Sequence, residues 1–178
     1  MESFVSLWNT LMVIGVFASL VAILGFVITL ISPKSLISQR ISALTSKNIL
    51  LIGFLLSTAA LISSLVYSNV IGYPPCLLCW YSRIVFYPQV ILFGMALRKK
   101  DRNILSYAQI LTGIGLLIST YHYITESIQY SPLPCSARQV SCLTRYVYEL
   151  GFITIPFMGL VGFLTLFLAI RVAKRARN

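Results

Sequence analysis

Five long apolar segments restrict this chain to folds that cross a membrane. They cover residues 4–31, 49–71, 80–98, 104–124 and 150–170, and a helix needs about 20 residues to span a bilayer. Only 10% of the 178 residues are charged and 58% are hydrophobic, whereas a soluble domain has about 25% charged residues. The sequence excludes a soluble globular protein, a disordered chain and a collagen-like repeat. It predicts an all-α integral membrane protein.

Most basic residues lie between these segments, and their distribution predicts how the chain sits in the lipid bilayer. The chain carries 14 Lys+Arg against 4 Asp+Glu, a net charge of +10. Three basic residues follow the first segment, four lie around the connection after the third, and four follow the fifth. These connections share one side of the membrane, which the positive-inside rule makes cytoplasmic. We therefore expect the N-terminus outside, the C-terminus inside, and no nucleic-acid binding.

The first segment is expected to be a retained helix and not a cleavable signal peptide. It lacks a preceding basic region and a clear small-residue cleavage site, and its apolar run is too long. The longest connection, residues 125–149, is too short to hold a soluble domain. The sequence therefore predicts one compact helical bundle.

Four cysteines form two close pairs in loops that we expect on the same side of the membrane. Cys76 and Cys79 form a C-x-x-C before the third segment, and Cys135 and Cys142 lie between the fourth and fifth. Two crossings separate the loops, and the charge pattern makes their shared side extracytoplasmic, where disulfides persist. Two cysteine pairs on one oxidising surface are what a thiol–disulfide relay requires.

The residues around the first pair favour a reactive thiol. Pro74 and Pro75 precede Cys76, and Cys79 falls at the expected start of the third helix. Helix N-termini and nearby cations stabilise thiolates. Arg83, four residues after Cys79, lies on the same helical face about one turn away.

From the residues alone, other interpretations stay open. Both cysteine pairs could be inert structural disulfides, or together they could bind zinc as a four-cysteine site. Arg83 could be an interfacial anchor, and His122, near the end of the fourth segment, could be an interfacial polar residue.

Two stretches of sequence resemble the DsbB family of disulfide bond formation proteins, and most closely its short bacterial form often called BdbC. They are CLLCWYSRIVFYPQ at residues 76–89 and GFITIPF at residues 151–157. The likeness covers about residues 49–170. It implies a DsbB-like four-helix membrane domain over residues 49–178. Residues 1–48 would be an extra N-terminal transmembrane helix with a basic cytoplasmic loop.

The resemblance implies a membrane thiol–disulfide oxidoreductase of the bacterial plasma membrane. Such a protein reoxidises an extracytoplasmic DsbA-like thiol oxidase of the thioredoxin fold and passes the electrons to a membrane quinone, ubiquinone or menaquinone. Carried over to this chain, Cys76–Cys79 would be the redox-active disulfide coupled to the quinone. Cys135–Cys142 would be the one that exchanges with the oxidase. No metal or flavin is implied, because the quinone carries the redox chemistry.

Two further residues match the quinone side of the family, and one departs from it. Arg83 matches the arginine beside the quinone, and His122 lies where family members can carry a histidine near the quinone. Ser82 stands where the family commonly has an acidic or amide residue. The alternatives are a vitamin-K-epoxide-reductase-like quinone reductase, whose reactive C-x-x-C comes later in its helical order, and a non-catalytic membrane protein with structural disulfides.

Overall fold

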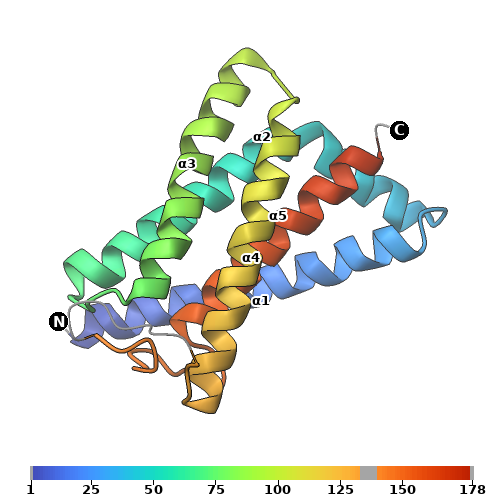
Figure 1. The fold of residues 1–178 in the computed structure, drawn as a ribbon. Helices are drawn as coiled ribbons and strands as arrows, with labels where there is room; N and C mark the ends of the chain where they lie inside the picture. Colours follow the sequence, from blue (N-terminus) through green and yellow to red (C-terminus); the bar gives the residue numbers. More distant parts are fainter. Residues whose placement is uncertain (1, 133–139, 177–178) are drawn as a thin grey trace.

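The computed structural model describes residues 2–132 and 140–176, and within them the protein consists of long helices without a β-strand (Figure 1). The helices are α1 (Glu2–Ile31), α2 (Leu36–Leu65) with its π-helical extension η1 (Val66–Val70), α3 (Leu77–Lys99), α4 (Ile104–Ile128) and α5 (Ile155–Arg175). Five spans are long and apolar enough to cross a membrane, with η1 continuing α2 in the second. The expected all-α, multi-pass membrane protein is confirmed.

Some predicted boundaries were wrong, and local backbone chemistry explains the differences. α2 begins at Leu36 instead of residue 49, because Ser35 caps it by accepting a hydrogen bond from the Ser38 backbone N–H at 3.1 Å. The expected basic loop is therefore only a short turn, and Arg40 lies on α2. α5 begins five residues later than predicted because Leu150 and Gly151 have φ of 52° and 79° and form a turn.

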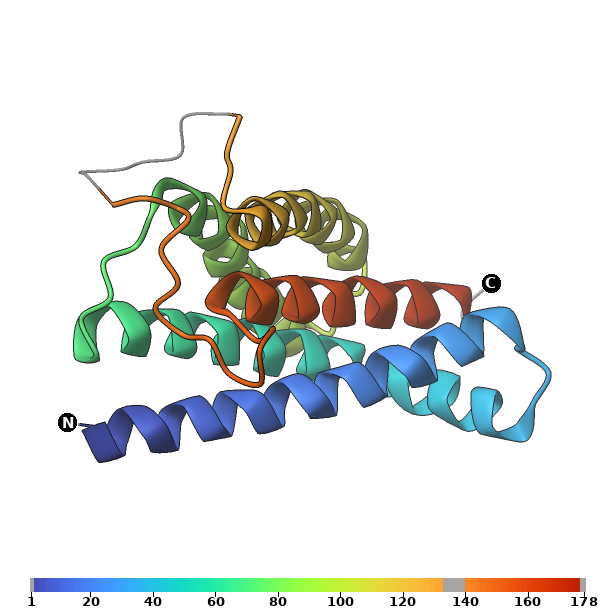
Figure 2. The ribbon, with the colours of Figure 1, turned by 90° about the horizontal axis from the view of Figure 1, so that it is seen from below.

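The helices pack in layers, with α1 on the outside. In Figure 2, α1 runs along one face of the molecule, α2 and α5 lie next to it, and α3 and α4 lie beyond them. α1 packs against both α2 and α5, and α5 also packs against α4. α1 is therefore a packed part of the bundle.

Aromatic rings packed over glycines bring the helices close together. The buried ring of Phe163 on α5 lies directly over Gly115 on α4, and Phe93 on α3 lies directly over Gly53 on α2. Phe163 also stacks on Phe86 of α3, with 3.7 Å between ring centroids. These contacts hold α2 against α3 and pack α3, α4 and α5 together.

Candidate redox site

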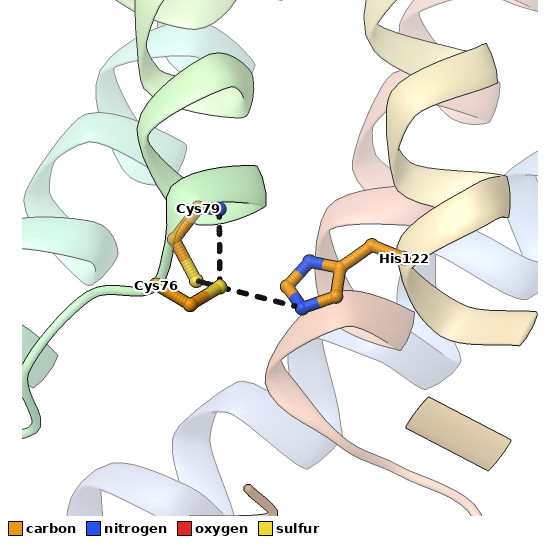
Figure 3. Close-up of side chains that lie close together, drawn as sticks. All are labelled: Cys76, Cys79 and His122. Atoms are coloured by element: carbon orange, nitrogen blue, oxygen red, sulfur yellow. Dashed lines mark hydrogen bonds between the residues drawn. The ribbon is translucent and has the colours of Figure 1, made fainter. Parts of the chain in front are cut away.

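Cys76 is the N-cap of α3, and this geometry sets the position of the first cysteine pair. Its backbone is extended, with φ of −74° and ψ of 176°, and its Sγ accepts a hydrogen bond from the Cys79 backbone N–H at 3.3 Å. The two sulfurs lie 2.9 Å apart (Figure 3). The C-x-x-C spacing places both thiols at one helix end, where unpaired backbone N–H groups favour negative charge.

His122 approaches this pair from α4. Its Nε2 lies 3.6 Å from the Cys76 Sγ, and its side chain is buried (Figure 3). The structure therefore brings together two predicted site residues that are 46 positions apart. A neutral imidazole at this position can accept a proton from the thiol or donate a hydrogen bond to its sulfur.

The donor atoms of Cys76, Cys79 and His122 all lie within 4.8 Å of one another, close enough to consider a metal site. Two sulfurs bound to one tetrahedral zinc would lie about 3.8 Å apart, given Zn–S bonds of about 2.3 Å. The observed 2.9 Å between the sulfurs is shorter. The arrangement suits sulfur–sulfur chemistry better than zinc coordination.

The second cysteine pair is described only in part. Cys135 lies outside the described residues, which stop at residue 132 and resume at 140. Cys142 is buried in one cluster with Cys76 and Leu78, against which Cys79 also packs. The loop between α4 and α5 therefore places Cys142 beside the first pair.

Arg83 lies one turn below Cys79 on α3, and α2 holds its guanidinium. Its Nε donates a hydrogen bond to Ser64 Oγ at 2.7 Å, and its Nη2 donates to the Ser64 carbonyl at 3.0 Å. The Cζ atom of its guanidinium lies 5.2 Å from the centre of the Trp80 ring. The sequence did not single out Ser64, because a serine in an apolar segment shows no sign of its partner on another helix.

A cavity of about 470 Å³ opens beside these groups. Cys76, Cys79, Arg83, His122 and Cys142 all line it, and the remaining lining residues come from all five α-helices, η1 and the connecting loops. Its volume falls within the range of about 300–1,000 Å³ typical of small-molecule sites. The predicted site residues that the structure describes therefore share one chamber.

A stack of three tyrosines forms part of the wall at the loop end of the chamber. Tyr73 stacks on Tyr67 of η1 at 6.1 Å and on Tyr146 of the second loop at 4.8 Å between centroids. Tyr67 also donates a hydrogen bond to Asn9 Oδ1 at 3.1 Å. The stack is not visible in the sequence, because its members belong to segments that only the fold brings together.

We expect Cys76 to be alkylated slowly at neutral pH. The hydrogen bond with Cys79 and burial raise the pKa of the Cys76 thiol more than His122 lowers it. The thiol then stays protonated at pH 8, and iodoacetamide should modify it at least about tenfold more slowly than a thiol in an unfolded peptide, because the thiolate is the reacting form. The rate should climb as the pH rises through 9 and 10.

This rate can be measured by mass spectrometry on the reduced Cys135→Ser, Cys142→Ser double variant, with the same protein unfolded in detergent as control. Equal rates in the folded and unfolded samples at pH 8 would contradict the expectation.

Comparison with known proteins gives the family. The model of "Disulfide bond formation protein DsbB" matches residues 46–173. This chain belongs to the DsbB family. The match makes it a membrane protein of disulfide formation, as the two sequence stretches indicated, and α1 lies outside the matched residues.

Several curated relatives agree with this assignment. A "Probable disulfide formation protein" of Oceanobacillus iheyensis is 44% identical over 125 residues, 68% of this chain and 86% of the relative. The "SPbeta prophage-derived disulfide bond formation protein B" of Bacillus subtilis is 41% identical over 121 residues, 68% and 82% of the two chains. The "Probable disulfide formation protein C 1" of Bacillus anthracis is 40% identical over 111 residues, 62% and 80% of the two chains. No solved structure matches.

Proposed function

We propose that this protein reoxidises an extracytoplasmic DsbA-like thiol oxidase of the thioredoxin fold and passes the electrons to a membrane quinone, ubiquinone or menaquinone. The main observation in support is that three cysteines lie together beside one chamber: Cys76, Cys79 and Cys142. Arg83 and His122 line the same chamber. In this proposal the chain lies in a bacterial plasma membrane with its N-terminus and cysteine loops outside and its C-terminus in the cytoplasm. DsbB-family membership favours this function over a vitamin-K-epoxide-reductase-like one.

The residues around the chamber fit a quinone. A quinone has a flat ring with two oxygens that accept hydrogen bonds, and membrane quinones carry an apolar tail. Arg83 and His122 supply donors beside the thiols, and the rest of the wall is largely apolar. Bound there, a quinone would supply a two-electron oxidant for the cysteine pair, with no need for a metal or flavin.

The proposed relay begins at the second pair. A thiolate of the reduced oxidase attacks one sulfur of the Cys135–Cys142 disulfide and forms a mixed disulfide, and the other sulfur leaves as a thiolate that takes up a proton. The second thiol of the oxidase loses its proton and displaces the bound cysteine. The oxidase then holds a disulfide, and this protein has gained two electrons and two protons as a Cys135, Cys142 dithiol.

The same exchange carries both electrons and protons to the first pair. A thiolate from the second pair attacks the Cys76–Cys79 disulfide, and two successive displacements restore Cys135–Cys142 while leaving Cys76 and Cys79 as thiols. Packing of Cys142 against Cys76 supports this transfer. His122, 3.6 Å from Cys76 Sγ, is placed to take up the thiol's proton when Cys76 returns to the disulfide.

Arg83→Ala should weaken quinone use while sparing thiol exchange. A hydrogen bond to a charged group contributes about 1.5–3 kcal/mol, so the quinone KM should rise by about 10- to 100-fold. The quinone KM of Arg83→Lys should fall between those of Arg83→Ala and wild type. Lysine keeps the positive charge but cannot donate the two hydrogen bonds that the guanidinium donates to Ser64. Arg98→Ala, on the same helix at its other end, is the matched control.

Steady-state quinone reduction gives the KM, and single-turnover oxidation of the reduced oxidase gives the exchange rate. If Arg83→Ala slowed the exchange as much as quinone reduction, its role would be structural.

A further inference from the structure

We propose that α1, which lies outside the family-matched residues, forms one wall of the quinone chamber, and that Gly15 and Ala18 leave the space in which the quinone lies against it. This inference rests on the proposed function. It gives the extra helix a binding role in place of a simple anchoring one.

The first observation is the set of α1 residues that face the chamber. They lie along two turns of the helix and are mostly small or apolar: Met12, Gly15, Val16, Ala18 and Ser19. A Cβ built on Gly15 would meet no heavy atom within 4 Å. Gly15 and Ala18 are both exposed and line the chamber, so a larger side chain at either position would enter open space at this wall.

The second observation is a buried carboxyl oxygen on another wall that has no hydrogen-bond partner among the described residues. Glu126 on α4 is 2% exposed and lines the chamber, and its Oε2 has no hydrogen-bond partner among the described residues. Because a buried carboxyl oxygen without a partner is costly, it indicates that the chamber receives a polar ligand atom or water. Glu126 follows His122 by one helical turn, so both lie on one face of α4.

The chamber therefore has a polar side and an apolar side. Arg83, His122 and Glu126 come from α3 and α4, whereas the α1 wall offers mostly small and apolar side chains. A membrane quinone also has a polar part and an apolar part, because its ring carries oxygens and its tail is a hydrocarbon.

The third observation is that α1 is fixed at both ends. Near the thiol end, Asn9 Nδ2 donates a hydrogen bond to Glu149 Oε1 at 3.1 Å and Asn9 Oδ1 accepts from Tyr67 at 3.1 Å. At the opposite end, Arg175 Nη1 donates to the Leu30 carbonyl at 2.6 Å. These hydrogen bonds connect α1 to the second loop, η1 and α5. They therefore fix the position of the α1 wall relative to the thiols.

The test uses the full-length protein and places larger side chains on α1 so that they enter the chamber. Gly15→Ala, Gly15→Leu and Ala18→Leu add side chains of graded size at the wall. Thr10→Leu is the matched control, because Thr10 is exposed on the same helix, like Gly15 and Ala18, but does not line the chamber. Quinone binding is measured as quenching of tryptophan fluorescence by a short-chain ubiquinone and a short-chain menaquinone, since Trp80 lies against Arg83. The rate of thiol exchange with a reduced thioredoxin-fold oxidase is the second readout.

We expect Gly15→Leu and Ala18→Leu to raise the quinone Kd at least about tenfold. Gly15→Ala should give a smaller rise in the same direction, Thr10→Leu should leave the Kd unchanged, and thiol exchange should persist in all four variants. Gly15→Ala keeps the test decisive even if a leucine variant unfolds, because a single methyl group has room there.

Other outcomes would overturn the inference in distinguishable ways. If wild type binds quinone and the wall variants bind it equally well, α1 is not a wall of the site, and the proposed function stands. If the wall variants lose only phospholipid that purifies with the protein, the face holds a lipid chain instead. If wild type binds neither quinone, the proposed function itself fails.

Discussion

Replacing Cys79 with serine is expected to reduce turnover below about 1% of wild type, because a hydroxyl cannot enter thiol–disulfide exchange in place of sulfur. Cys79 lies in the first turn of α3, with its sulfur 2.9 Å from that of Cys76. Without it, the Cys76–Cys79 disulfide of the proposed relay cannot form. Turnover is measured as the oxidation of a reduced thioredoxin-fold oxidase in the presence of quinone.

The same variant separates a relay from a structural disulfide. Loss of a structural disulfide typically costs about 2–5 kcal/mol of stability, whereas a relay cysteine can be replaced by serine with little effect on the fold. We therefore expect the melting temperature of Cys79→Ser to stay close to that of oxidised wild type. A variant that unfolds at a much lower temperature but retains turnover when folded would contradict the relay.

Gly115→Ala is expected to destabilise the bundle strongly, although it adds only a single methyl group. A Cβ at Gly115 would overlap the buried ring of Phe163, which stacks on Phe86 at 3.7 Å between centroids. Overpacking of this kind costs about 1–3 kcal/mol, and a chain of this size loses about 2–4 °C in melting temperature for each kcal/mol. Because Phe86 lines the chamber, displaced rings should also weaken quinone binding.

Gly113→Ala, two residues earlier on α4, is the matched control for this prediction. A Cβ there would make an ordinary contact with Phe167 at 3.8 Å, and alanine favours the helix by up to about 1 kcal/mol. We expect its melting temperature to equal or exceed that of wild type. Equal destabilisation by both substitutions, in thermal unfolding in detergent, would show that the Phe163 contact does not decide the effect.

Local patterns predicted the parts of the structure that depend on neighbouring residues. The apolar segments predicted the spanning helices. Cys79 was expected at the start of the third helix, and it lies in the first turn of α3, which begins at Leu77 with Cys76 as its N-cap. Counting membrane crossings put both cysteine loops at one end of the bundle, and the packing of Cys142 against Cys76 agrees with that placement. Helical spacing placed Arg83 one turn from Cys79.

Contacts between distant segments could not be predicted in the same way. The bond from Arg83 to Ser64 depends on how α2 packs against α3, and the chain of contacts from Asn9 to Tyr67 depends on the position of α1. The early start of α2 was missed because basic residues suggested a loop, although Arg40 and Lys47 are exposed on the helix. The chamber itself is a product of packing among five helices, and no single stretch of sequence contains it.

The most direct test of the account is the stoichiometry of electron transfer by the purified protein in detergent. Under anaerobic conditions, a reduced thioredoxin-fold oxidase is mixed with the protein and either ubiquinone or menaquinone, and quinone absorbance and free thiols are followed together. We predict that one quinone is reduced for each disulfide formed in the oxidase, with no reaction when this protein is omitted. A folded protein that reduces neither quinone, or that oxidises thiols without consuming quinone, would contradict it.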